Sequence, residues 1–273
     1  MDLINLLWVF LIIISLQPIL LQKWIEKARI TLIRKIEKKR NSRVILIVHR
    51  QETMSFLGFP VIKYLNMEDS EAVLRAIETT PEDKNIDLVL HTPGGLVLAA
   101  LQIARAILNR KGKVSVIVPH YAMSGGTLIA LAADEIIMSP HAVLGPIDPQ
   151  LGQFPAASIL NITQKKDINK IEDETLIMAD MAEKALNQMK ESAKEILKKH
   201  FNDEKAEELA KLLTSGKWTH DYPITSQMAK DLGLNVNTEI PRDFLNLMEL
   251  YPQPLKHSRN VEYIPETFKK EEK

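Results

Sequence analysis

The chain of 273 residues contains no cysteine. This absence excludes disulfide bonds, thiolate metal sites and cysteine nucleophiles. The chain also has no excess charge, since 35 lysines and arginines balance 35 aspartates and glutamates. Proteins that bind nucleic acids usually carry a strong basic excess, so no nucleic-acid partner is expected. The seven histidines lack a ligand spacing such as His-x-x-x-His, and they predict no zinc site.

The N-terminal segment, residues 1–22, is almost wholly apolar between Leu3 and Leu21. At about 1.5 Å per residue, a helix of this length is long enough to cross a bilayer core. The segment lacks a basic start and a small-x-small cleavage site, which favours an uncleaved transmembrane anchor over a signal peptide. Residues 23–41 mix apolar and basic residues at helical spacing. They predict a connector helix, either lying on anionic lipid or solvated.

Charge differs between the two ends of this anchor. Asp2 is the one charged side chain before it, whereas lysines and arginines are frequent between residues 23 and 43. The positive-inside rule places the more basic side in the cytoplasm. The sequence therefore predicts a single-pass protein of the cell membrane whose C-terminal body faces the cytoplasm.

Residues 42–250 alternate between strand-like and helical patterns. Strand-like runs cover 44–48, 86–91, 114–118 and 135–138, and helical patterns cover 67–79, 96–109 and a stretch that begins at 127. This order predicts a mainly parallel sheet covered by helices, with sites at the carboxyl ends of its strands. Residues 173–213 predict a long helical stretch with a break near 201–203. The tail, residues 251–273, is proline-containing and charged, and we expect it to be flexible.

Ser124 lies between the strand-like run 114–118 and the helical pattern that begins near Thr127. Gly125 and Gly126 follow it, where the backbone N–H groups at a helix N-terminus are free to bind an anion. A nucleophilic serine needs such donors, because its attack on a carbonyl group creates an oxyanion. The pattern favours Ser124 as a nucleophile, and an ordinary strand-to-helix turn is the alternative.

A second glycine loop lies upstream of the serine. Gly94 and Gly95 separate the strand-like run 86–91 from the helical pattern 96–109. Two consecutive glycines let the backbone approach a ligand closely and direct N–H groups at it. Two strand–loop–helix units, with a serine in the second alone, support a catalytic site better than either loop does.

Four motifs in this order resemble a known family. They are His-Thr-Pro-Gly-Gly95, Tyr-Ala-Met-Ser-Gly-Gly-Thr127, Ser-Pro-His-Ala-Val-Leu-Gly-Pro-Ile-Asp-Pro-Gln150 and Ser-Gly-Lys-Trp-Thr-His220. The chain is similar, over about residues 42–250, to the SDH-family Clp-fold serine proteinases, relatives of signal peptide peptidase. The resemblance implies an α/β fold of the Clp protease/crotonase type, in which ββα units form a spiral. It also implies a homo-oligomer, because small relatives with this fold assemble into rings.

The resemblance also implies roles for individual residues. Ser124 matches the nucleophile and Gly125 matches a backbone donor of the oxyanion hole. Gly94 and Gly95 match the loop of the second donor, and which of the two supplies the N–H group stays open.

The general base is the least defined part of the expected site. The position of the Clp histidine falls here on Pro149 and Gln150, so a Clp-type triad is not expected. Signal peptide peptidases use a lysine instead, and Lys166, followed by Lys165, lies in the corresponding stretch. A lysine serves as a base only where burial or a nearby cation lowers its pKa. Two solvated loop lysines are the alternative.

Histidine is the second candidate for the base. His141 is the best of the three histidines near the motifs, with Asp148 as the carboxylate that would orient it. His91 and His120 are more consistent with hydrogen-bonded structural groups.

We therefore expect a membrane-anchored serine endopeptidase that cleaves peptides or membrane-protein segments and needs no metal or organic cofactor. An acyl-CoA enzyme of the crotonase type shares the fold and is the first rival. A non-catalytic membrane scaffold is the second.

Overall fold

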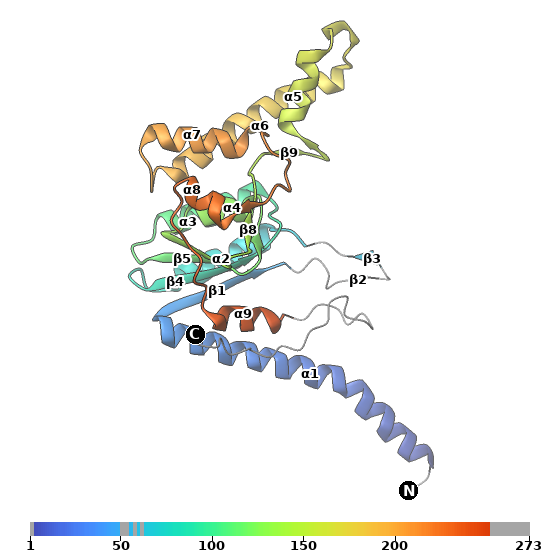
Figure 1. Cartoon of the computed structure of the whole chain (residues 1–273). Coiled ribbons are helices and arrows are strands. Elements are labelled where there is room, and N and C mark those ends of the chain that lie inside the picture. The colour runs from blue at the N-terminus through green and yellow to red at the C-terminus, as the bar shows by residue number, and fades with distance from the viewer. Residues whose placement is uncertain (1–2, 50–54, 57–58, 61–62, 252–273) are drawn as a thin grey trace, which may run out of the picture.

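A parallel β-sheet forms the centre of the molecule (Figure 1). The computed structural model describes residues 3–49, 55–56, 59–60 and 63–251, with the side chains of residues 16–49 and 63–251. The main sheet has five strands in the order β1-β4-β5-β7-β12, and every pairing in it is parallel. Its strands are β1 (Ser42–Val48), β4 (Asn85–His91), β5 (Val114–Val118), β7 (Glu135–Met138) and β12 (Val236–Asn237). The predicted parallel sheet is confirmed.

A smaller sheet lies beyond the carboxyl ends of the main strands. It has the order β11-β8-β6, where β8 runs parallel to β6 and antiparallel to β11. Its strands are β6 (Tyr121–Ala122), β8 (Val143–Leu144) and β11 (Ile224–Thr225). Two short hairpins complete the strands, β2 (Ser55–Phe56) with β3 (Phe59–Pro60) and β9 (Gln150–Leu151) with β10 (Phe154–Pro155).

Helices cover both faces of the main sheet (Figure 1). They are α1 (Leu3–Arg40), α2 (Met67–Glu78), α3 (Val97–Leu108), α4 (Gly125–Leu131), α5 (Ala156–Lys165), α6 (Asp173–Leu197), α7 (Asp203–Thr214), α8 (Ser226–Asp231) and α9 (Arg242–Glu249), with a short 3₁₀ helix at Ile168–Lys170. The gap between α6 and α7 matches the break predicted near residues 201–203. Chain order also repeats a simple unit, because β5 is followed by β6 and α4, and β7 by β8 and later α5.

Alternate residues of the central strands pack against different helices, as the period of two in a strand requires. Leu88 of β4 and Val116 of β5 belong to the core shared with α2, α3, α4 and α6. Their neighbours Val89 and Ile117 belong to the core shared with α1 and α9. Because both faces are buried, the strands are continuous apolar runs, which explains why the sequence pattern identified them.

Helix α1 is a single continuous helix that covers both the predicted anchor, residues 1–22, and the predicted connector, residues 23–41, apart from their end residues. Its C-terminal part packs on the sheet through Ile36, which lies in the same core as Phe244 of α9. Within the part of the chain that the structure describes, no helix has the length and apolar character required to cross a membrane. The side chains of residues 1–15 lie outside that part, and so do residues 252–273 of the predicted tail.

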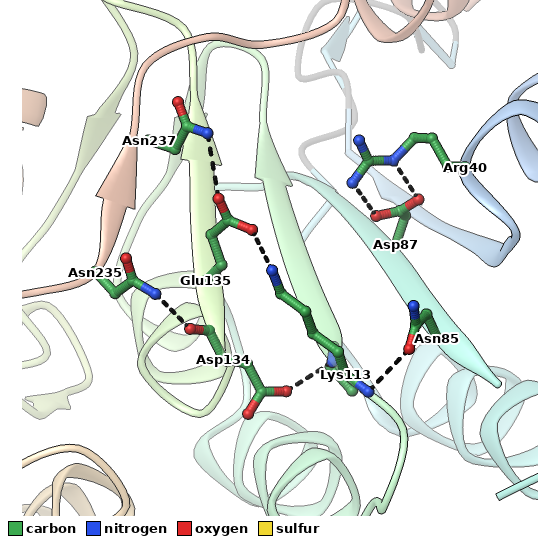
Figure 2. A network of polar contacts seen from close by, with 9 residues as sticks. Arg40, Asn85, Asp87, Lys113, Asp134, Glu135, Asn235 and Asn237 are labelled. Carbon is green, nitrogen blue, oxygen red and sulfur yellow. Dashed lines mark hydrogen bonds and ion pairs between the residues drawn. The ribbon is translucent and has the colours of Figure 1, made fainter. Parts of the chain in front are cut away.

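Polar side chains connect the amino ends of the main strands (Figure 2). Lys113 Nζ lies 2.7 Å from Glu135 Oε2, and Asp134 Oδ2 accepts a 2.7 Å hydrogen bond from Val114 N. The buried carboxylate of Asp87 accepts two hydrogen bonds from Arg40, of 2.7 and 2.9 Å. These contacts hold the edge of the sheet opposite to the carboxyl ends, so the network is structural.

Replacing Arg40 by methionine is expected to destabilise the fold by about 2–4 kcal/mol, because it leaves a buried carboxylate without its cation. Asp87 is 2% exposed and would keep one further donor, the hydroxyl of Ser42 at 2.5 Å. Lys113→Met is the control, because that side chain is 52% exposed and its loss should cost less than about 1 kcal/mol. Chemical unfolding of the two variants measures the difference, and equal costs would contradict the interpretation.

Candidate active site

Three chain segments leave the β-structure at the same edge. In the small sheet Ala122 of β6 is paired with Leu144 of β8, and Thr92 forms a parallel bridge with Ala122. Parallel strands end at a common edge, so the residues that follow each pair lie together. Gly94 and Gly95 follow the first strand, Ser124 the second and Asp148 the third. The site predicted at the carboxyl ends of the strands is therefore assembled from several of them.

Ser124 occupies a strained turn between β6 and α4. It directly precedes α4 as the N-cap residue, with φ 49° and ψ −117°. Among the non-glycine residues described, it shares a positive φ with Asn41 alone. Such a backbone conformation costs about 1–3 kcal/mol and is typical of functional sites. It matches the sharp strand-to-helix turn that presents the nucleophilic serine in α/β-hydrolases. The Ser124 side chain is also partly exposed, as a nucleophile must be.

The two glycine loops are in direct contact. A Cβ atom placed on Gly94 would lie 2.7 Å from Ser124 Cβ and 2.9 Å from the nitrogen of Gly125. Gly94 also has a φ of +101°, which residues with a side chain rarely adopt. Glycine is therefore required at this position, because any side chain would displace the serine or cover the helix N-terminus.

The hydrogen bonds of the loop distinguish between the two candidate donors. The N–H group of Gly94 donates to Thr92 Oγ1 at 3.1 Å and is occupied. Among the described residues, the N–H groups of Gly95 and Gly125 have no hydrogen-bond acceptor. The structure thus favours Gly95 over Gly94 as the second donor, a choice that the sequence left open.

The chain before α2 sets the direction of the Gly95 N–H group. The backbone N–H of Leu65 donates to the carbonyl oxygen of Gly94 at 2.7 Å, and Leu65 O accepts from Leu96 N at 2.8 Å. In a trans peptide the C=O and N–H groups point in opposite directions. Because the carbonyl group of Gly94 points toward Leu65, the N–H of Gly95 points away from Leu65 and toward Gly125. A Cβ atom placed on Gly125 would lie 3.7 Å from Gly95 N.

Replacing Gly95 by alanine is expected to destabilise the protein by about 2–4 kcal/mol and to remove activity, because strain and overlap act together. Gly95 has a φ of +152°, and its new Cβ would overlap the Leu65 carbonyl oxygen and lie 2.5 Å from the Leu65 nitrogen. Gly152→Ala is the matched control, since Gly152 also has a positive φ of +63° but open space around it. That control should cost about 1–2 kcal/mol. Thermal unfolding compares the two, and a smaller cost at Gly95 would contradict the clash.

A histidine and a carboxylate form a pair at the same edge. His220 Nδ1 lies 2.9 Å from Asp148 Oδ1, and Gln150 Nε2 donates to Asp148 Oδ2 at 2.6 Å. Asp148 is 3% exposed. The hydrogen bond to Asp148 raises the pKa of His220 above its ordinary value, although burial opposes the shift. An Nδ1–H donor on His220 leaves Nε2 as the acceptor, which is the tautomer that a general base requires.

Strand register explains how two residues so far apart in the sequence meet. Strand β11 is antiparallel to β8, with Ile224 opposite Leu144. His220 precedes Ile224 by as many residues as Asp148 follows Leu144, so the two side chains extend from the same end of the pair. The order of the sheet, β11-β8-β6, then places this histidine–carboxylate pair beside the strand that leads to Ser124.

His141 is not the partner of Asp148. It is exposed and lies before β8, whereas Asp148 follows β8. The expected His141–Asp148 pair is therefore wrong, and His220 takes that position. His91 is buried and lies against Tyr121 and His120, with ring centroids 4.3 and 5.4 Å away.

The two candidate lysines lie away from the serine. Lys165 ends α5 and Lys166 follows it, and both side chains are exposed. Helix α5 begins at buried Ala156, near the site, and its ten residues carry the chain about 15 Å outward. Figure 1 shows α5 projecting beyond the body together with the first part of α6, whereas α4 lies inside it. The structure therefore does not bring Lys165 or Lys166 together with Ser124.

Sequence reasoning assigned no role to His220. The signal was present in the motif Ser-Gly-Lys-Trp-Thr-His220, which contributed to the resemblance. Within residues 16–49 and 63–251, the structure shows no group of three or more His, Asp or Glu side chains that could hold a metal ion.

The parallel sheet, the strained serine and the facing glycine loop define a serine proteinase of the ClpP-like class. The sequence model of the ClpP-like SDH-type serine proteinases matches residues 1–273, and the chain belongs to this family.

The chain is also similar to individual proteins. The uncharacterized protein MJ1495 of Methanocaldococcus jannaschii is 53% identical over 272 residues, which cover 100% of this chain and 92% of that protein. The probable protease SohB of Haemophilus influenzae is 35% identical over 107 residues, which cover 37% of this chain and 28% of that protein. Among solved structures, a mutant of the 1510-N membrane-bound stomatin-specific protease is similar, with a TM-score of 0.46 and 23% identity over 67% of this chain and 79% of that one.

Proposed function

We propose that this protein is a serine endopeptidase in which Ser124 attacks the peptide carbonyl group. One observation carries the proposal: Ser124 has a strained backbone, with φ 49° and ψ −117°, directly beside the unbonded N–H group of Gly125. The N–H group of Gly95 is the second donor for the oxyanion. Such donors act on charge that develops in the transition state, and each contributes about 3 kcal/mol to lowering the barrier.

His220 is the general base of the proposed mechanism. Its Nε2 takes the proton of the Ser124 hydroxyl as Ser124 Oγ adds to the carbonyl carbon, and it later gives that proton to the leaving amine as the C–N bond breaks. Water then adds to the acyl-enzyme with the same base and releases the serine. Asp148 holds the Nδ1–H of His220 and stabilises the imidazolium ion that forms. Lys166 and Lys165 are the competing bases, and their exposure on a projecting helix argues against them.

Apolar side chains around the second glycine loop suggest the class of substrate. Tyr64, Leu96, Val97 and Leu98 are 53%, 53%, 43% and 59% exposed, and they flank Gly94 and Gly95 in the sequence. Exposed apolar groups gathered at a site are typical of binding surfaces. We therefore propose substrates with apolar segments, which include peptides and segments of membrane proteins.

Membrane attachment through the N-terminal helix is part of the proposal. Leu16, Leu20 and Trp24 of α1 are 45%, 64% and 64% exposed. Between residues 23 and 38 of α1, four exposed cations have no acidic partner among the described residues: Lys23, Lys27, Arg34 and Lys38. Spacings of four and seven residues place these cations on the same side of the helix as the leucines. An apolar stripe that leads into a basic one suits an anchor followed by anionic lipid headgroups.

The anchor predicts that the full chain stays in the membrane fraction after an alkaline carbonate wash, which releases peripheral proteins. Protease added outside intact cells should leave the body uncut, because the basic stripe orients it toward the cytoplasm. A chain released by the wash would contradict the anchor, and a digested body would contradict the orientation alone.

A homo-oligomer is proposed on the exposed apolar side chains of the projecting helices. Ile162 of α5 and Ile177 and Met181 of α6 are between 48% and 62% exposed. Phe154 of β10, before α5, and Ile168 of the 3₁₀ helix, between α5 and α6, are 60% and 66% exposed. A patch of this kind in a soluble part of a protein marks an interaction surface. Sedimentation of the detergent-solubilised chain tests the proposal, since a monomer would contradict it.

Peptide hydrolysis is the direct test of the function. Incubation with unfolded protein substrates should create new termini, which mass spectrometry identifies, and cleavage should be frequent beside apolar residues. Turnover of acyl-CoA thioesters without peptide cleavage would favour a crotonase-type enzyme. A chain that is inert toward both would be a scaffold.

A further inference from the structure

We propose that the Thr92 hydroxyl, held by His49 and Asp69, positions the Gly94–Gly95 loop for the reaction. The inference rests on the proposed peptidase function and assigns positioning roles to residues that touch neither the nucleophile nor the base. Thr92 ends the strand segment that leads into the loop, and His49 follows β1 on the neighbouring strand. Asp69 lies in the first turn of α2, so three separate elements meet at this point.

The contacts form an unbroken chain of hydrogen bonds. Asp69 Oδ2 lies 3.2 Å from His49 Nε2, and His49 Nδ1 lies 2.8 Å from Thr92 Oγ1. Thr92 Oγ1 accepts from the backbone N–H of Gly94 at 3.1 Å. The side chain of His49 is 7% exposed and Thr92 is fully buried, so water does not compete for the His49–Thr92 and Thr92–Gly94 hydrogen bonds, whereas the Asp69 side chain is 30% exposed.

The number of hydrogen atoms on each group determines which group donates and which accepts in this series of hydrogen bonds. A carboxylate accepts only, so His49 donates from Nε2 to Asp69 and keeps Nδ1 as an acceptor. The Thr92 hydroxyl then donates its one hydrogen atom to Nδ1 at 2.8 Å, because its other acceptor, Gly94 O, lies farther away at 3.5 Å. A lone pair on Oγ1 faces Gly94 N–H. Burial lowers the pKa of His49, with Asp69 opposing the shift. The neutral imidazole that this arrangement requires is therefore favoured.

The chain of hydrogen bonds ends on the N–H group of Gly94, in the peptide group directly before the one that supplies the oxyanion donor. Thr92 holds the N–H group of Gly94 on one side, and Leu65 N holds its carbonyl oxygen on the other at 2.7 Å. The first contact holds the peptide group before Gly94 Cα and the second holds the peptide group after it. Together they fix the backbone torsions of Gly94, and these torsions set the direction of Gly95 N–H. Two glycines with positive φ would otherwise leave this segment free to rotate.

Asp69 also caps the N-terminus of α2, and this contact fixes its position. Its Oδ2 also accepts from the backbone N–H of Asn66 at 3.0 Å, while Asn66 Oδ1 accepts from Asp69 N at 2.9 Å. This reciprocal pair is a capping box, which stabilises the start of α2. The start of α2 thus fixes the Asp69 carboxylate that orients His49. The position of α2 therefore determines the position of the His49 ring and of the Thr92 hydroxyl.

The test measures how fast a fluorophosphonate labels Ser124, because this reagent reacts with an activated serine and its adduct uses the oxyanion hole. Thr92→Val keeps the shape of the side chain and removes the hydroxyl. It is expected to slow labelling by about tenfold to a hundredfold, and to lower kcat with KM nearly unchanged. Thr92→Ser, which restores a hydroxyl, should recover most of the rate.

Thr214→Val is the matched control, since Thr214 is a buried threonine whose hydroxyl donates to Ala210 O in α7. It should label at the wild-type rate. Wild-type labelling by folded Thr92→Val, or equal losses in the valine and serine variants, would overturn the positioning role. If the wild-type chain itself is not labelled, the proposed function fails, and the positioning role fails with it.

Two histidine variants keep the test decisive if Thr92→Val does not fold. An asparagine at position 49 can place an amide oxygen where Nδ1 accepts from Thr92, whereas a glutamine extends toward Asp69. His49→Asn should therefore label several-fold faster than His49→Gln. Equal rates in the two variants would overturn the proposal.

Discussion

Replacing Ser124 by alanine is expected to lower peptide hydrolysis by about five orders of magnitude or more, because the variant has no nucleophile. The fold should persist. The side chain is only partly buried, and alanine must adopt the same positive φ that serine already tolerates. The Ser124→Ala chain should therefore still bind substrate, with loss of kcat rather than an increase in KM.

Ser192→Ala is the control for this result, since Ser192 is a partly buried serine on α6 outside the site. Its activity should equal that of the wild type. Full activity in folded Ser124→Ala would show that another group performs the reaction, and the mechanism proposed above would be wrong.

Replacing His220 by alanine is expected to lower kcat by about four orders of magnitude, because the serine then has no proton acceptor. Lys165→Ala and Lys166→Ala should change kcat by less than about twofold, as substitutions on an exposed surface usually do. The comparison decides between the two bases. An active His220→Ala variant together with an inactive lysine variant would restore the lysine mechanism.

The pH dependence gives the same prediction an independent readout. His220 must be neutral to act as a base, so kcat/KM should rise with pH through a pKa above the ordinary histidine value of about 6.5. Asp148 raises this pKa, and Asp148→Asn should move the acidic limb to lower pH. Stability has the opposite dependence. The contribution of the pair is complete below the unfolded-state pKa and is lost as pH rises through the higher folded-state pKa.

Much of the fold could be predicted because it depends on local patterns. The central strands are apolar on both faces, and the loops that follow them contain paired glycines. These patterns also indicated that Ser124 and the loop of Gly94 and Gly95 each lie between a strand and a helix, and the structure places both there. The choice of Gly95 over Gly94 could not be predicted, because it depends on a hydrogen bond from Gly94 to Thr92.

The pairing of His220 with Asp148 could not be predicted, because it depends on long-range strand register. His220 reaches Asp148 since β11 returns antiparallel to β8, and no local pattern records which strands become neighbours. The resemblance directed attention to Lys166 and Lys165, which the structure places on exposed α5. Local sequence likewise divided α1 into an anchor and a connector, although its backbone is one helix.

The most direct test of the account is the position of a fluorophosphonate adduct, mapped by mass spectrometry of the digested chain. A single adduct on Ser124, formed by the native protein and absent after unfolding or in His220→Ala, is the predicted result. Folded protein that forms no adduct, or forms it on a different serine, would contradict the claim that the strained turn and its facing amides activate this hydroxyl.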